Sequence, residues 1–218
     1  MDGKLRCPVC GSPSDVSWRP CRPCAAEMTR RPATACSLCG IDLAGSDDPC
    51  PSCRGTFSPL DETVALGMWS GALREWVSLL KYGGDRRLSE WLADALGDII
   101  GERWPDAFVV PVPPRFRRLL TNGYDAVNET AFVLRRRGFP VIRPLRRCGS
   151  QTQKALDREE RLNASVLKFK MKAGYRVEGK RIVLVDDVST TGSTLRACAE
   201  LLKVNGAVYV AGLVACKD

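Results

Sequence analysis

Two adjacent acids followed by small hydroxyl residues form the stretch of this chain with the clearest chemical potential. Asp186 and Asp187 come directly after the apolar run 182–185, and the next seven residues read Val-Ser-Thr-Thr-Gly-Ser-Thr. Backbone amides at the start of a helix bind anions, and Gly192 would let a phosphate approach the backbone closely. The two carboxylates could accept hydrogen bonds from a sugar diol. The stretch therefore predicts a site for a sugar phosphate.

The segments around this stretch predict an open α/β sheet. The run 182–185 has no polar alternation, which fits a strand covered on both faces, as in a parallel sheet. From Leu195 to Leu202, apolar residues recur at the three-and-four spacing of a helix. Open sheets of this class bind ligands at the carboxyl ends of their strands. No lysine follows Gly192, so the loop is not a P-loop.

The sequence from Val183 to Thr194 resembles the phosphoribosyl pyrophosphate (PRPP) motif of type I phosphoribosyltransferases. The resemblance implies that Asp186 and Asp187 contact the ribose hydroxyls, and that Mg²⁺ accompanies PRPP. It also implies a loop around the 5'-phosphate, made of Ser189, Thr190, Thr191, Gly192, Ser193 and Thr194. The structural alternative is an ordinary buried strand followed by a polar turn, but such a turn does not require adjacent acids.

Eight of the eleven cysteines lie within residues 1–57, in four Cys-x-x-Cys pairs. The last two pairs repeat the first two with an offset of 29 residues, which suggests two similar modules. Two such pairs can complete a structural zinc site of four thiolates. We expect pairing within each repeat, with Cys7, Cys10, Cys21 and Cys24 on one ion and Cys36, Cys39, Cys50 and Cys53 on the other.

Other arrangements of these cysteines remain open at this point. A cross-braced pairing of the same residues is possible, and iron fits the same ligand set. Disulfides are the main alternative, but a chain without an export signal is expected where thiols stay reduced. The segment has few apolar residues for a core, so we expect metal binding to supply its folding energy.

Charge is distributed unevenly along the chain. Lys and Arg number 33 against 25 Asp and Glu, a net charge of +8. The region 110–172 alone holds fifteen basic and five acidic residues. A positive surface beside a phosphate site suits a polyanion, either pyrophosphate or a nucleic-acid backbone.

Composition also excludes some functions. The chain has no histidine, which excludes both a Cys-His nucleophile and a Ser-His-Asp triad. The longest uncharged apolar runs, 63–73 and 206–216, are each eleven residues, too short to cross a bilayer. The first seven residues carry charges with no apolar stretch behind them, so we expect a cytoplasmic protein.

The remaining pattern divides the chain into residues 1–57, a double zinc ribbon, and 58–218, an α/β domain with a mostly parallel sheet flanked by helices. Strands are expected at 63–68, 107–112, 141–145 and 206–214. Helices are expected at 69–81, 88–100, 124–137 and 155–163. Residues 146–154 read as a basic loop.

Motifs along nearly the whole chain are similar in kind and order to those of the ComF family. They are the four cysteine pairs, 80–83, 111–113, Gln153 with Leu156 and Arg161, and 186–187 with 190–192. Members join an amino-terminal zinc finger to a type I phosphoribosyltransferase-like domain. The family is associated with natural competence, the uptake and handling of single-stranded DNA. The resemblance implies PRPP, single-stranded DNA and competence or recombination proteins as partners.

The resemblance also assigns residues around the PRPP motif. It places the pyrophosphate side at 111–118, with Arg115 and Arg118, and a flexible loop at 146–153, with Arg146, Arg147 and Gln153. The family pattern after Pro-Val-Pro, Arg-Gly-Phe-Asn-Gln, reads Asn-Gly-Tyr-Asp-Ala here, from 122 to 126. Asp125 would repel pyrophosphate, which bears on turnover more than on ribose-phosphate binding.

Three functions follow from these features. The first is a ComF-like protein that binds PRPP and acts in the uptake and handling of single-stranded DNA. The second is an active phosphoribosyltransferase that transfers ribose 5-phosphate to an acceptor, for which the sequence shows no specific residues. The third is a zinc-ribbon docking protein with a degenerate site. Binding of PRPP separates the third function from the first two, and release of pyrophosphate separates the second from the first.

Overall fold

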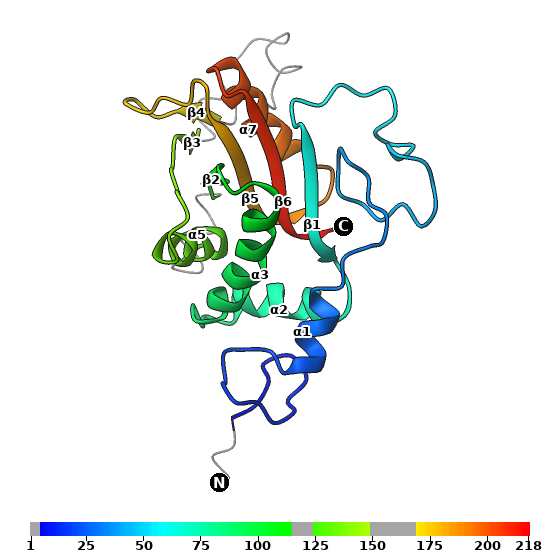
Figure 1. Cartoon of the computed structure of the whole chain (residues 1–218). Coiled ribbons are helices and arrows are strands. Elements are labelled where there is room, and N and C mark those ends of the chain that lie inside the picture. Colours follow the sequence, from blue (N-terminus) through cyan, green and yellow to red (C-terminus); the bar gives the residue numbers. More distant parts are fainter. Residues whose placement is uncertain (1–4, 115–123, 149–168) are drawn as a thin grey trace.

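A four-stranded parallel sheet, in the order β1–β6–β5–β2, forms the centre of the molecule (Figure 1). The computed structural model describes residues 5–114, 124–148 and 169–218. The strands are β1 (Glu62–Met68), β2 (Phe108–Pro111), β5 (Arg181–Ser189) and β6 (Tyr209–Lys217). The predicted strand 206–214 is therefore found as β6 with a later start, because Gly206 and Ala207 still close the turn after the preceding helix.

Helices cover both faces of this sheet. On one face lie α2 (Gly71–Tyr82), α3 (Leu88–Arg103) and α5 (Ala126–Arg136), and on the other lies α7 (Ser193–Val204) (Figure 1). Val183 and Val185 of β5 pack with α2 and α3, whereas Ile182 and Leu184 pack with α7. The apolar run therefore lacks alternation because both of its faces are buried, as predicted.

The first cysteine module belongs to the same core as the helices. Its helix α1 (Arg22–Met28), which the sequence analysis did not predict, follows Cys21 and has proline in its first turn. Cys7, Cys24 and Met28 pack in one cluster with α2 and α3. The second module has a separate small core around Leu43. The two modules therefore differ in how they join the sheet domain, although their sequences repeat.

The expected strand 141–145 is wrong in its position. Val141 makes one isolated parallel bridge with Val109 of β2, and the regular strand β3 (Leu145–Arg147) begins only at Leu145. Pro144 interrupts the segment because it has no N–H to donate to a ladder. Strand β3 pairs antiparallel with β4 (Phe169–Met171). The expected helix 155–163 lies outside the described residues, as does most of the loop 146–154.

Helices long and apolar enough for a transmembrane segment are absent from the described part of the chain.

Candidate functional site

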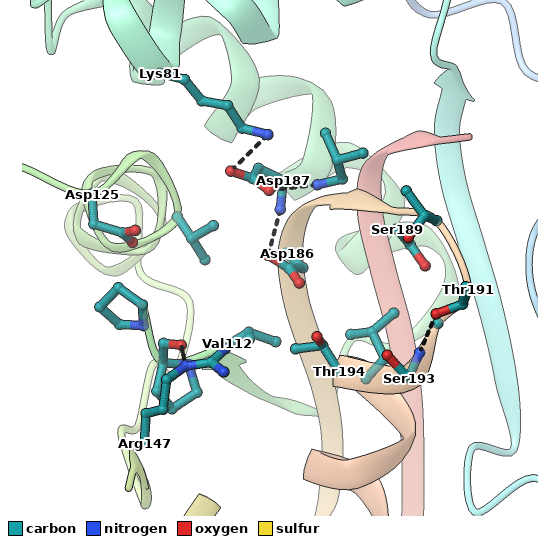
Figure 2. A pocket seen from close by; sticks show the side chains of 17 residues that line it. Lys81, Val112, Asp125, Arg147, Asp186, Asp187, Ser189, Thr191, Ser193 and Thr194 are labelled. Atoms are coloured by element: carbon teal, nitrogen blue, oxygen red, sulfur yellow. Dashed lines mark hydrogen bonds and ion pairs between the residues drawn. The ribbon is translucent and has the colours of Figure 1, made fainter. Parts of the chain in front are cut away.

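A cavity of about 300 Å³ opens at the carboxyl end of β5, where the strand turns into α7. Figure 2 shows that Asp186, Asp187 and the loop hydroxyl groups face this cavity from one side, while Lys81 and Asp125 approach from the helices. Every residue predicted for PRPP lines it, namely Asp186, Asp187, Ser189, Thr190, Thr191, Gly192, Ser193 and Thr194. The structure thus brings together all eight of these predicted residues.

The loop between β5 and α7 turns at Gly192. This residue is the N-cap of α7 and has φ of 71°, a left-handed conformation that glycine adopts without steric cost. The amide of Ser193 donates to the hydroxyl oxygen of Thr191 at 3.4 Å. Because the first amides of a helix lack intrahelical acceptors, the start of α7 presents donors and the positive end of its dipole to the cavity. This geometry suits a phosphate.

Lys217 holds the other side of the same loop. Its side chain is buried, and its Nζ donates to the carbonyl oxygen of Thr190 at 2.6 Å. The amide of Asp218 donates to the carbonyl oxygen of Ser189 at 3.0 Å. The sequence analysis missed Lys217, although a single lysine after the apolar run 210–216 was an available signal. The last strand therefore fixes the backbone of the loop between β5 and α7.

The two adjacent acids have different environments. The amide of Asp187 donates to the Asp186 carboxylate at 2.9 Å, but burial and the neighbouring Asp187 raise the pKa of Asp186 to about 7. Asp187 is 6% exposed, and its carboxylate lies 3.1 Å from the Lys81 ammonium. The amide of Val188 also donates to Asp187, at 2.7 Å. Asp187 thus forms an ion pair with Lys81, whereas the raised pKa of Asp186 means that this acid titrates near neutral pH.

Lys81 is a second residue that the sequence analysis did not assign to the site. It lies in the last turn of α2, and its Nζ is 5.5 Å from the centre of the Trp69 ring. An ammonium over an aromatic face is stabilised by the ring quadrupole. The Tyr124 hydroxyl donates to the backbone oxygen of Leu80 beside it, which ties this end of α2 to the start of α5.

Asp125, the departure from the family pattern, lies in the same cavity. Its side chain caps α5 by accepting a hydrogen bond from the amide of Asn128 at 2.9 Å, and it is 4% exposed. Pro113 and Pro114 line the cavity on this side. A carboxylate in this position makes the side predicted for pyrophosphate more negative.

Arg147 is the described member of the predicted basic residues that lines the cavity. Its Nε donates to the carbonyl oxygen of Pro113 at 3.2 Å, and its guanidinium lies 4.5 Å from the centre of the Phe169 ring. Arg146 is exposed and does not line this cavity. The remaining predicted residues, Arg115, Arg118 and Gln153, lie outside the described residues.

The eight amino-terminal cysteines form two groups. In each group all four sulfur atoms lie within 4.8 Å of one another, and the groups are Cys7, Cys10, Cys21, Cys24 and Cys36, Cys39, Cys50, Cys53. The sulfurs of Cys10 and Cys21 are 3.6 Å apart, and those of Cys39 and Cys50 are 3.8 Å apart. Four thiolates at the usual zinc–sulfur distance of about 2.3 Å are spaced about 3.8 Å apart in a tetrahedron. Each group can therefore hold a tetrahedral metal ion.

Comparison with known proteins identifies relatives of this chain by sequence. Residues 141–217 match the phosphoribosyl transferase domain family. The DNA utilization protein YhgH of Escherichia coli strain K12 is 29% identical, over 94% of this chain and 93% of its own length. The competence protein ComFC of Bacillus subtilis strain 168 is 26% identical, over 93% of this chain and 90% of its own length. The chain is a homologue of YhgH and ComFC.

The recognition of a ComF-like chain from its motifs is thus confirmed. The domain match and the parallel sheet flanked by helices also confirm the predicted fold class. Among solved structures, a hypoxanthine phosphoribosyltransferase from Staphylococcus aureus is similar, with 11% identity, coverage of 60% of this chain and 63% of that chain, and a TM-score of 0.39.

Proposed function

We propose that this ComFC and YhgH homologue binds PRPP in the cavity at the end of β5 and acts in the handling of single-stranded DNA. The observation that carries the proposal is the convergence of both acids and the Gly192 loop on one cavity. Its volume of about 300 Å³ is at the lower end of the range for small-molecule sites.

The proposed binding mode follows from the chemistry of each wall. The 5'-phosphate lies at the start of α7, where backbone amides and hydroxyl groups of the loop donate to it. The ribose hydroxyls donate to the carboxylates of Asp186 and Asp187. The pyrophosphate lies toward Pro113 and Arg147 with Mg²⁺, which neutralises phosphate charge when it is bound.

Binding rather than transfer is proposed because of Asp125. Its carboxylate lines the cavity near Pro113 and Pro114, where a phosphoribosyl transfer would release pyrophosphate. Repulsion between Asp125 and a pyrophosphate leaving group would raise the barrier of such a step. Turnover is tested separately, by release of pyrophosphate from PRPP with purines, pyrimidines or nucleic acid as acceptors.

The two cysteine groups are proposed to hold zinc with a structural role. The spacing of the sulfurs fits four thiolates around one ion, and four protein ligands leave no open position for catalysis.

The cellular role rests on the relatives. The names of YhgH and ComFC refer to DNA utilization and competence, and each relative aligns over at least 90% of its own length. A net charge of +8 supports a polyanionic partner. We extend these roles to this chain as part of the proposal.

The test is a thermal shift and calorimetric titration of the full chain with PRPP and Mg²⁺. The variant carries Asp186→Asn and Asp187→Asn, and the matched control carries Asp98→Asn and Asp106→Asn, two exposed acids away from the cavity. Two charge-assisted hydrogen bonds contribute on the order of 1.5–3 kcal/mol each, so the site variant should lose at least about 100-fold in affinity. An equal shift in all three proteins would refute the proposed site.

A further inference from the structure

A second, basic groove adjoins the candidate PRPP cavity. It has a volume of about 350 Å³ and lies between the end of β2 and the β3–β4 pair. We call it the ribbon groove, and its lining is Pro111, Pro113, Pro114, Asn128, Arg143, Leu145, Arg146, Arg147, Cys148 and Lys172. Pro113, Pro114 and Arg147 also line the PRPP cavity, so the two share one wall.

The charge of the ribbon groove has one sign. Arg143, Arg146, Arg147 and Lys172 line it, and no acidic residue does so within the described part of the chain. Among the described residues, Arg143 donates to a neutral partner, the amide oxygen of Asn128, at 3.4 Å. Within the described ranges 5–114, 124–148 and 169–218, no carboxylate forms an ion pair with Arg143, Arg146 or Lys172.

The strand pairing adds a further positive charge at the edge of the groove. Arg146 of β3 lies directly opposite Lys170 of β4, and both side chains are exposed. Like charges directly opposite each other destabilise a pair of strands. A bound anion would relieve this repulsion, so the pair costs stability in the free protein and favours a polyanion in the complex.

We infer that the ribbon groove binds the phosphate backbone of single-stranded nucleic acid along the wall that it shares with the PRPP cavity. The inference rests on the proposed function, because it names the surface through which the chain would handle DNA. Positively charged grooves that follow the backbone are the usual electrostatic element of single-strand binding.

The groove contacts phosphates rather than bases. Its neighbouring aromatic side chain, Phe169, is 2% exposed and is covered by the Arg147 guanidinium. Among the described lining residues there is no exposed aromatic ring on which a base could stack. Binding should therefore show little base preference, and oligo-dT and oligo-rU of equal length should bind with similar affinity.

Fluorescence anisotropy with a labelled twenty-nucleotide oligo-dT, at salt from 50 to 200 mM, tests this inference. Four phosphate contacts predict a slope of about −3 in a plot of log affinity against log salt, or a loss of about 50-fold over this range. The groove variant carries Arg143→Gln and Lys172→Gln, two residues that line the groove and not the PRPP cavity. Removing two contacts should reduce the slope to about −1.4 and weaken binding at 50 mM salt.

The matched control carries Arg135→Gln and Arg136→Gln, which remove the same charge from exposed positions at the end of α5. The inference holds if the groove variant loses slope while the control keeps the wild-type slope, and it is overturned if both variants lose slope equally or neither does. Absence of oligonucleotide binding by the unmodified chain would overturn both the inference and the proposed role in DNA handling. The thermal shift on adding PRPP is also measured for the groove variant, and it should equal that of the unmodified chain. Loss of nucleic-acid binding is thereby distinguished from loss of PRPP binding.

Discussion

Lys81 of α2 and Asp187 of β5 form a buried ion pair, with 3.1 Å between Nζ and the carboxylate and side-chain exposures of 8% and 7%. Breaking a buried pair by removing one partner leaves an uncompensated charge. Lys81→Met should therefore lower the free energy of unfolding by about 3 kcal/mol or more. It should also weaken PRPP binding, because the cavity becomes more negative. Denaturant unfolding and calorimetry measure the two effects.

A double variant distinguishes the ion pair from general packing. Lys81→Met combined with Asp187→Asn should cost less than the sum of the single substitutions, because no buried charge is left unpaired. The exposed pair between Arg87 and Asp85 serves as a control. Asp85→Asn should cost less than about 1 kcal/mol. Additive single effects at Lys81 and Asp187 would contradict the role given to the pair.

Binding of PRPP should depend on pH through Asp186. Burial and the Asp187 carboxylate raise the pKa of Asp186 to about 7, with Lys81 acting in the opposite direction and Asp125 adding to the rise. The ionised carboxylate accepts stronger hydrogen bonds from ribose hydroxyls than the protonated acid does, so affinity should rise as pH increases from about 6 to 8. Calorimetric titrations across this range measure the profile.

Asp186→Asn provides the reference for that profile. The phosphate groups of PRPP also titrate near pH 6, and their contribution remains in the variant. The difference between the two profiles therefore reports Asp186 itself, and identical profiles would exclude it from the site. The raised pKa has a second consequence: the folded protein holds a proton that the unfolded chain has lost above about pH 4. The stability contribution of this group is thus present below pH 4 and is lost as pH rises toward 7.

Gly192 should be intolerant of a side chain for reasons of backbone conformation. Its φ is 71°, and a Cβ would meet its nearest neighbour, Nη1 of Arg196, at 3.5 Å, an ordinary contact. Gly192→Ala should therefore cost about 1–2 kcal/mol through the left-handed conformation alone. Relief of that strain would move the loop amides and weaken PRPP binding.

Gly174 is the matched control for this substitution. It has φ of 82°, open space around the position of a Cβ, and no place in the cavity. Gly174→Ala should cause a similar loss in thermal stability and leave the affinity for PRPP unchanged. Equal loss of affinity in both variants would show that the loop geometry at Gly192 is not specific to binding.

The turn between β5 and α7 could be predicted from sequence because its information is local. Residues 182–194 contain, in order, a buried strand, two acids and a glycine turn. Because these features are adjacent in sequence, the position of the strand determines where the acids and the turn lie. Lys81 and Lys217 come from segments far along the chain, so no local pattern connects them with Asp187 or Thr190. Their role becomes visible only when β5, β6 and α2 are placed side by side.

The errors of the sequence analysis also have physical causes. The strand expected at 141–145 was judged from its apolar residues, and Pro144 has more influence on the ladder than they do. Helix α1 was missed because residues 22–28 begin within the second cysteine pair and show little helical periodicity. The repeat in the cysteine segment suggested two similar modules and gave no sign of their different packing, in which the sheet domain buries only the first one in its main core.

Because only the first module packs in the main core, we predict different effects of losing one proposed metal ligand in each module. Cys24 packs in the main core, and Glu27 of the same helix accepts a hydrogen bond from the amide of Ala72 at the start of α2, at 2.8 Å. Cys24→Ser should therefore expose α2 to hydrogen exchange and weaken PRPP binding, because α2 carries Lys81. Cys53→Ser, in the separate core, should leave the exchange of α2 and the PRPP affinity within about twofold of the unmodified chain. Hydrogen-exchange mass spectrometry measures both variants, and equal deprotection of α2 in the two would show that the modules do not differ in this way.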